Sequence, residues 1–418
     1  MEDRRNASAV KAVVEATASA KELFLSDSMR THASRICCRA LRAARTGLDG
    51  NRGHCELLTG ARGQGKTEFL LFLKEALSRL VDEDGDSGDD GDTDDDSDSD
   101  DDDDDSDDDS DNHDHSGGNG CRRPVRAIHI DLSTDASTHP LTLLAEAAGV
   151  TLAAKHLALD GIRAGLQHIH DALVAAKACV VLLVDEYHTV YTSTILAHQL
   201  WRTALYCIPN TRFEGDRNMR VFAVLTGSSA WTHSLAFGQA RRDPDRFPLY
   251  EGAKQNLNTQ RYISRDFAAL SSVQDVAGFL KYKHGVEPDD ETVDQSFFLT
   301  GGNIGRMASA REGTQGLPYA TTGNFLDTHL DLLQLLRKAS EQCQIDTGDG
   351  PNKTFPWFLD TPVRYLTEVN GGEAVPAQRL YEAADSGAIV FYDEQQRVRF
   401  ATPALASRVA NLSATAVP

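Results

Sequence analysis

The strongest constraint on the fold is a glycine-rich segment at residues 60–67, which reads Gly-Ala-Arg-Gly-Gln-Gly-Lys-Thr. The short apolar run before it, 55–59, predicts a strand, and the periodic apolar pattern after it, 66–80, predicts a helix. Glycines at 60, 63 and 65 allow backbone conformations that side chains exclude, so that consecutive N–H groups can surround a phosphate. The segment therefore predicts a strand, turn and helix that bind a phosphate-bearing ligand.

The residue types of this segment suit a nucleoside triphosphate with a metal ion. The predicted helix directs the positive end of its dipole at the phosphates, Lys66 is expected to neutralise the β and γ oxygens, and Thr67 to bind Mg²⁺. A chance match is the alternative, and average residue usage predicts one in about a hundred chains of this length. We predict ATP and Mg²⁺ as ligands. The residues expected at the nucleotide are Gly60, Ala61, Arg62, Gly63, Gln64, Gly65, Lys66, Thr67 and Glu68.

A second element is the apolar run 180–184, which is followed by Asp185 and Glu186. Such a run predicts a buried parallel strand, and ligands of α/β proteins bind at the carboxyl ends of these strands. We expect Asp185 to hold Mg²⁺ through water and Glu186 to orient and deprotonate the attacking water. Solvated strand ends also carry acidic pairs, but the glycine-rich segment upstream favours the catalytic interpretation.

Other polar residues are candidates for contacts to the γ-phosphate. Thr226 ends an expected strand at 220–226 and Ser228 follows it, where an ordinary turn of small residues explains them equally well. Arg306 begins an expected helix after the sequence Gly-Gly-Asn-Ile-Gly, and could reach the phosphate when that helix closes. Four further arginines are candidates for action on a neighbouring subunit, with a plain surface position as the alternative: Arg241, Arg242, Arg246 and Arg261.

Strand and helix patterns alternate along the first two thirds of the chain, which predicts an α/β fold with a parallel sheet between helices. The other expected strands are 125–132, 179–184 and one that begins at 262. Expected helices lie at 8–44 (one or two), 140–148, 157–176 and 193–207. Helices at 270–283, 289–298, 304–312 and 326–343 predict a helical lid. Helices at 362–369 and 376–385, followed by strands at 388–392 and 398–401, predict a winged-helix-like module.

We expect four parts: an N-terminal helical segment (1–48), a nucleotide-binding core (49–266), the lid (267–345) and the winged-helix-like domain (352–418). Within the core, residues 82–120 form an acidic tract without apolar residues to bury, which predicts a disordered insertion. This tract holds 22 of the 63 acidic residues, and the remaining 41 nearly balance the 42 basic ones. The net charge of −21 is therefore local and indicates no nucleic-acid-binding surface.

The environment of the chain is expected to be intracellular, either cytoplasmic or nuclear. The seven cysteines are scattered and lack metal-ligand spacing, which argues against a disulfide framework. No apolar run approaches the roughly 18 residues that a membrane span needs. The sequence Asn112-His113-Asp114-His115 in the acidic tract could bind a divalent metal weakly, but a solvated charged run is the simpler interpretation.

These motifs together resemble the additional-strand class of P-loop NTPases, which includes the AAA+ and STAND ATPases. The resemblance rests on residues 60–67, 180–186, Thr226-Gly227-Ser228-Ser229 and Gly301-Gly302-Asn303. The last is similar to the glycine-glycine-asparagine-proline turn of archaeal-type STAND ATPases, although Ile304 stands where proline is usual. The resemblance implies the sheet order 5-1-4-3-2. Crinkler and retrotransposon-hot-spot proteins have a similar core with low-complexity insertions, but we recognise none of their usual header, nuclease or kinase domains here.

The resulting hypothesis is a Mg²⁺-dependent ATPase that acts as a nucleotide-driven switch or motor. A non-hydrolysing, nucleotide-gated scaffold is the first alternative. A DNA-transaction ATPase that uses the winged helix is the second, although the mixed charges of that module do not favour DNA. Expected partners are ATP, an unidentified protein and further copies of the chain.

Overall fold

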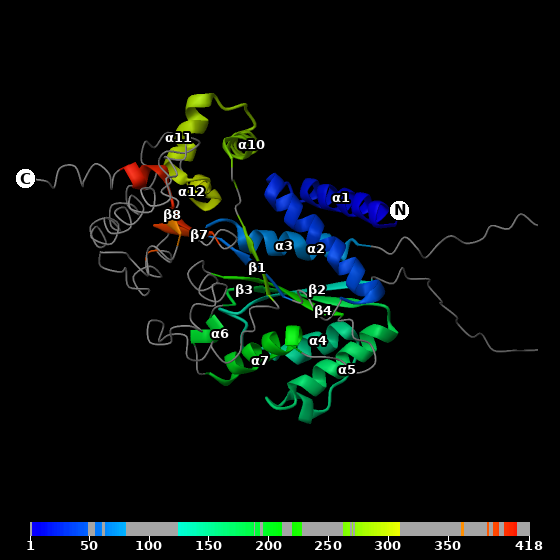
Figure 1. Cartoon of the computed structure of the whole chain (residues 1–418). Coiled ribbons are helices and arrows are strands. Elements are labelled where there is room, and N and C mark those ends of the chain that lie inside the picture. Colours follow the sequence, from blue (N-terminus) through cyan, green and yellow to red (C-terminus); the bar gives the residue numbers. More distant parts are fainter. Residues whose placement is uncertain are drawn as a thin grey trace, which may run out of the picture.

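The computed structural model describes much of the chain up to residue 309 and selected residues nearer the C-terminus (Figure 1). The described residues are 2–48, 55–60, 63–80, 124–187, 189–192, 195–210, 220–227, 262–267, 270, 272–309, 361–362, 383, 388–392 and 397–407. Several predictions lie outside these residues, among them the acidic tract at 82–120 and the helix at 326–343.

The described residues form an α/β fold around a parallel sheet. Its strands are β1 (Cys55–Thr59), β2 (Val125–Asp131), β3 (Cys179–Asp185), β4 (Val221–Thr226) and β5 (Tyr262–Asp266). They lie in the order β2-β3-β4-β1-β5, with every neighbouring pair parallel. Strand β3 is buried along its whole length, as expected for a near-continuous apolar strand in mid-sheet. Strand β4 therefore separates β1 from β3, in agreement with the order that the resemblance implied.

Helices cover both faces of this sheet (Figure 1). One face carries α1 (Glu2–Ala20), α2 (Asp27–Thr46) and α3 (Lys66–Ser78). The other face carries α4 (Pro140–Ala148), α5 (Ile162–Ala175) and α7 (Leu196–Asn210), while the short α6 (Thr189–Thr192) follows β3. Helix α3 buries Phe69, Leu70 and Leu73 completely, because its apolar residues recur on one side. This packing fixes the start of α3 beside the carboxyl ends of the strands.

The N-terminal helices belong to the same hydrophobic core as the sheet. Residues Ile36 and Ala40 of α2 are fully buried, and the carbonyl of Ala40 accepts a hydrogen bond from Cys179 Sγ at 3.2 Å. On β1, the buried Glu56 forms ion pairs with Arg35 and Arg39 of α2. Because a buried carboxylate is costly without a charged partner, this cluster ties α2 to β1.

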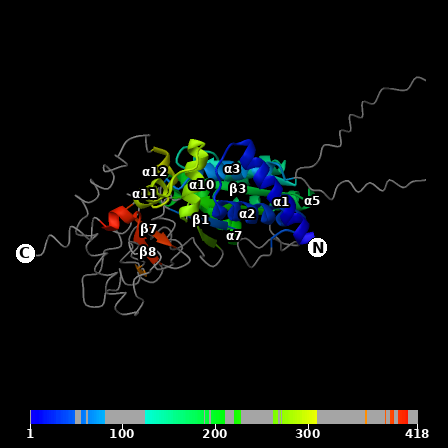
Figure 2. The ribbon, with the colours of Figure 1, turned by 90° about the horizontal axis from the view of Figure 1, so that it is seen from above.

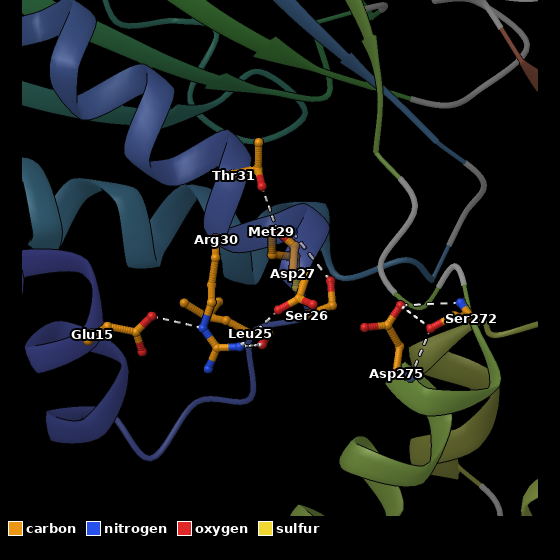
Figure 3. A network of polar contacts seen from close by, with 9 residues as sticks. All are labelled: Glu15, Leu25, Ser26, Asp27, Met29, Arg30, Thr31, Ser272 and Asp275. Atoms are coloured by element: carbon orange, nitrogen blue, oxygen red, sulfur yellow. Dashed lines mark hydrogen bonds and ion pairs between the residues drawn. The ribbon is translucent and has the colours of Figure 1, made fainter. Parts of the chain in front are cut away.

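The described part of the predicted lid contains α10 (Val273–His284), α11 (Asp290–Thr300) and α12 (Ile304–Ser309). Helix α10 begins later than the predicted residue 270, because Ser272 and Asp275 form a reciprocal capping box (Figure 3). The turn between α1 and α2 packs on α10: Phe24 lies edge-on to Phe279, with ring centroids 5.7 Å apart. The lid is therefore in contact with the N-terminal helices.

Helix α5 is shorter than the predicted helix at 157–176, whose start is wrong. The chain instead forms a 3₁₀ turn, η2 (Ala154–Leu157), before α5 begins at Ile162. A Cβ on Gly161 would lie 2.0 Å from the carbonyl oxygen of Lys155, so the glycine allows a close backbone approach between the two helices. Apolar periodicity alone did not reveal this local contact.

The described C-terminal residues include a three-stranded antiparallel sheet with the order β6-β8-β7 and a short helical segment at 403–407. Its strands are β6 (Thr361–Pro362), β7 (Ile389–Tyr392) and β8 (Arg397–Phe400). The hairpin of β7 and β8 agrees with the predicted strands. Of the predicted helices at 362–369 and 376–385, only Pro362, which is in β6, and Ala383, which is helical, are described. Figures 1 and 2 both show α11 and α12 beside β7 and β8.

The hydropathy of the helices and the state of the cysteines can be given for the described part of the chain. None of its helices combines the length and the hydropathy that crossing a bilayer would require. Its cysteines, Cys37, Cys38, Cys55, Cys179 and Cys207, are free thiols.

Candidate functional site

The carboxyl ends of three neighbouring strands bring the predicted polar residues to one edge of the sheet. The register pairs Leu58 of β1 with Thr226 of β4, and Val184 of β3 with Leu225 of β4. Asp185 is therefore level with Thr226, and both lie close to the turn that follows β1. The parallel sheet thus assembles residues that are far apart in the sequence.

The turn between β1 and α3 has the backbone that its glycines predict. Gly63 and Gly65 are left-handed, with φ angles of 82° and 80°, which residues with a Cβ rarely adopt. Gly65 caps the start of α3, where its carbonyl accepts the N–H of Phe69 at 2.9 Å. A Cβ on Gly60 would lie 2.6 Å from the carbonyl oxygen of Phe267. These glycines shape a tight turn at the N-terminus of a 13-residue helix, where anions are stabilised.

Lys66 is buried inside this turn, with 9% of its surface exposed. Its Nζ donates a hydrogen bond to the carbonyl oxygen of Gly60 at 2.8 Å. Burial lowers the pKa of Lys66 to about 8, and the carboxylates of Glu186 and Asp185 partly oppose this shift. An ammonium group in such a place gains more from a nearby phosphate than one in water would, because the local dielectric constant is low.

Asp185 accepts hydrogen bonds on both of its carboxylate oxygens. Its Oδ2 accepts the hydroxyl of Thr67 at 2.5 Å, and its Oδ1 accepts the hydroxyl of Thr226. The backbone N–H of Glu186 also donates to Oδ1, at 3.0 Å. Hydroxyl and carboxylate oxygens are the ligands that Mg²⁺ prefers, usually one or two from the protein together with phosphates and water. The pair formed by Thr67 and Asp185 therefore fits a magnesium ion bound with a nucleotide.

Glu186 has an unusual backbone, with a φ angle of 49°. Left-handed conformations are uncommon outside glycine, asparagine and aspartate, and they concentrate at functional sites. Hydrogen bonds hold the Glu186 peptide in place: its carbonyl accepts the N–H of Thr189 at 3.0 Å, and the next N–H, that of Tyr187, donates to the carbonyl of Thr226 at 3.0 Å. These bonds fix the backbone from which the Glu186 side chain extends.

The lid touches the glycine-rich turn directly. The N–H of Gly305 donates to the carbonyl of Gly63 at 2.7 Å. Asn303 Oδ1 accepts the N–H of Arg306 at 3.0 Å and so caps α12, and a Cβ on Gly63 would lie 2.8 Å from that same oxygen. The start of α12 is therefore packed on the turn, and Arg306, in the first turn of α12, is near the site.

The structure brings together most of the predicted residues that it describes. Lys66, Thr67, Asp185, Glu186 and Thr226 are interconnected by the contacts above. Glu68 is exposed on α3, and no described contact links it to the others. Gln64 lies half-buried between Gly63 and Gly65. The remaining predicted residues lie outside the described part: Ala61, Arg62, Ser228, Arg241, Arg242, Arg246 and Arg261.

Sequence reasoning missed several residues that shape the site. Met29 and Ile304 approach the glycine-rich turn: a Cβ on Gly65 would lie 3.9 Å from Met29 Cε and from Ile304 Cδ1. Phe267 is buried between His32 and Phe69, with its ring centroid 4.9 Å from that of Phe69. The apolar periodicity of 8–44 indicated a buried face on α2, but no local pattern could show which surface that face covers.

Comparison with known proteins gives weak structural likenesses. No family model matches the sequence, and no curated protein does. The ORC2 protein of Aeropyrum pernix with ADPNP and ADP is 13% identical, with a TM-score of 0.41 over 94% of this chain and 96% of that one. The Walker-type ATPase PABY2304 of Pyrococcus abyssi is 15% identical, with a TM-score of 0.38 over 86% and 91%. The Aeropyrum pernix ORC1 protein in complex with DNA is 15% identical, with a TM-score of 0.34 over 94% of each chain.

Structural similarity at these TM-scores and sequence identities indicates no particular activity for this chain. Support for a nucleotide site comes instead from the geometry of the turn at 60–67 and from the side chains that meet beside it.

Proposed function

We propose that this chain is a Mg²⁺-dependent ATPase that acts as a nucleotide-driven switch. The observation that carries the proposal is the convergence of four residues at one sheet edge: Lys66 and Thr67 at the start of α3, and Asp185 and Glu186 at the end of β3. Each supplies a group that hydrolysis of a phosphoanhydride needs: a cation, two oxygen ligands for a metal ion and a base.

The proposed mechanism depends mainly on the positions of the groups around the phosphates and on the neutralisation of the phosphate charge. Backbone N–H groups of the glycine-rich turn and Lys66 hold the β- and γ-phosphates. Thr67 and Asp185 would hold Mg²⁺, which neutralises charge on the phosphate oxygens. Glu186 orients a water molecule and accepts its proton as the water attacks the γ-phosphorus in line with the departing ADP oxygen. Arg306 is the candidate for a further positive charge from the lid.

A chain of close backbone contacts supports the proposal of a switch. The lid contacts the glycine-rich turn through Gly305 and Gly63, as described above. The turn between α11 and α12 makes two further close contacts. A Cβ on Gly302 would lie 2.2 Å from the carbonyl oxygen of Leu270, and a Cβ on Gly301 would lie 2.2 Å from the carbonyl oxygen of Ala401. Movement of the turn on nucleotide binding would therefore reach the C-terminal sheet, which we propose to be part of a winged-helix domain at 352–418.

Substitution of Gly301 by alanine is expected to disrupt the junction between the lid and the C-terminal sheet. The new Cβ meets a backbone oxygen, which cannot move aside as a side chain could, and Gly301 has a φ of 60°. Gly285→Ala is the matched control, since Gly285 has a φ of 70° with nothing within 4 Å. The control should lose about 1 kcal/mol from backbone strain alone, and Gly301→Ala clearly more. Thermal unfolding measures the stability of both variants. Equal losses of stability would contradict a close contact between Gly301 and the C-terminal sheet.

Phosphate release by the purified full-length protein, with ATP and Mg²⁺, tests the main proposal. Release that requires Mg²⁺ is the expected result. Binding of ATP without any release would instead identify the nucleotide-gated scaffold. Failure to bind ATP at all would overturn both forms of the proposal.

We propose the divisions 1–48, 49–266, 267–345 and 352–418, and an unidentified protein or further copies of the chain as partners. The DNA-transaction alternative predicts duplex binding that weakens steeply with salt, as expected when several phosphates are contacted. Binding that does not depend on salt, or no binding, would count against it.

A further inference from the structure

The two carboxylate oxygens of Asp185 have different partners. Oδ1 accepts two protein donors, the Thr226 hydroxyl and the Glu186 N–H, whereas Oδ2 accepts only the Thr67 hydroxyl among the contacts described above. Both Asp185 and Thr226 are buried, with 3% and 0% of their surfaces exposed. An ionised carboxylate has about two acceptor positions on each oxygen. Oδ1 is therefore saturated by the protein, and Oδ2 is the oxygen that faces the other candidate metal ligand.

We propose that Thr226 is a positioning residue for Asp185, and that it sets the affinity of the site for Mg²⁺. By anchoring Oδ1 at the end of β4, its hydroxyl fixes the Asp185 side chain so that Oδ2 points at Thr67. The proposal rests on the ATPase function above and deepens it. It also replaces the role that the sequence suggested for Thr226, a contact to the γ-phosphate or the attacking water, because its hydroxyl proton is already donated to Asp185.

A purely structural role for Thr226 makes a different prediction. Any buried threonine that loses its hydrogen bond is expected to destabilise a protein. Such a loss would lower the melting temperature without changing the dependence on metal ion. Thr17 is a suitable comparison, since it is also 0% exposed and donates to the carbonyl of Val13 at 2.7 Å, in α1 and apart from the site residues.

The test compares Thr226→Val, which keeps the shape but removes the hydroxyl, with Thr226→Ser, which restores it. Binding of a fluorescent ATP analogue is measured in EDTA and then during titration with Mg²⁺. We expect the Val variant to bind the analogue in EDTA as the unchanged protein does, and to need about 10- to 100-fold more Mg²⁺ for half-maximal effect, the range typical of residues that orient metal ligands. The Ser variant and Thr17→Val should titrate as the unchanged protein does.

The outcomes separate the two proposals. An unchanged Mg²⁺ titration of Thr226→Val, with a lower rate of phosphate release, would return Thr226 to the phosphate or water contact and overturn the positioning role. A protein that binds no nucleotide in EDTA or in Mg²⁺ would overturn the proposed function and this inference together. If the Val variant does not fold, Thr226→Ala removes the same hydroxyl and decides between the same outcomes.

Discussion

The variant Lys66→Ala is expected to lose ATP binding, with an affinity at least about 30-fold lower than that of the unchanged protein. Lys66 is the buried cation of the glycine-rich turn, and truncating one member of a buried charge pair costs about 2–5 kcal/mol. The same substitution removes the hydrogen bond from Nζ to the Gly60 carbonyl, so folding must be checked by thermal unfolding. Equilibrium binding of a fluorescent ATP analogue provides the measurement.

Lys74→Ala is the matched control for this experiment. Lys74 lies on the same helix, α3, but is exposed to solvent. Loss of its charge should leave ATP affinity almost unchanged, because exposed charges are screened by water and salt. Equal losses in the two variants would indicate a general electrostatic effect of α3, and undiminished binding by a folded Lys66→Ala protein would remove Lys66 from the phosphate site.

Local sequence pattern predicted much of the parallel sheet. Cys55–Thr59 and Cys179–Asp185 are short apolar runs next to glycine-rich or acidic residues, and the structure makes both of them strands at nearly the predicted boundaries. Helix α4 has the predicted boundaries as well, because Pro140 suits the first helical position and Gly149 the position after the last. In each case the signal lies within a few residues of the element, so a single sequence contains it.

Contacts between segments that are distant in the sequence could not be predicted. The ion pairs of Glu56 with Arg35 and Arg39 join a strand to a helix earlier in the chain, and an acidic residue within an apolar strand gave the only hint of them. The packing of Phe24 on α10 had no such hint. These contacts depend on how complete elements pack, and not on the periodicity of either segment.

In the candidate site, too, local features could be predicted from the sequence and contacts between distant segments could not. Glycine spacing and the acidic pair Asp185 and Glu186 at the end of β3 predicted which side chains meet, since both depend on local conformation. The partner of the Thr226 hydroxyl could not be predicted, because it follows from the register of β3 and β4, in which Val184 pairs with Leu225. A difference of one residue in that register would turn Thr226 away from Asp185.

The variant Glu186→Gln is expected to bind ATP and Mg²⁺ almost normally but to hydrolyse about 10²- to 10⁴-fold more slowly, the contribution typical of a general base. Glutamine keeps the size and the hydrogen-bonding length of the side chain but cannot accept the proton of the attacking water. The left-handed backbone at φ 49° is held by bonds from Glu186 N–H to Asp185 and from Thr189 N–H to the Glu186 carbonyl, which the substitution leaves intact.

Binding and turnover must be measured on the same preparation, because only their separation identifies a base. Glu75→Gln is the control: Glu75 lies on α3, where its carboxylate pairs with Arg79 at 3.1 Å on the surface, and its loss should change neither quantity. Unchanged hydrolysis by Glu186→Gln would exclude Glu186 as the base. Parallel losses of binding and turnover would show that Glu186 acts mainly through the charge it places near Lys66, as the opposing influence on the Lys66 pKa allows. Slow turnover with intact binding would leave proton transfer as the step that Glu186 supplies.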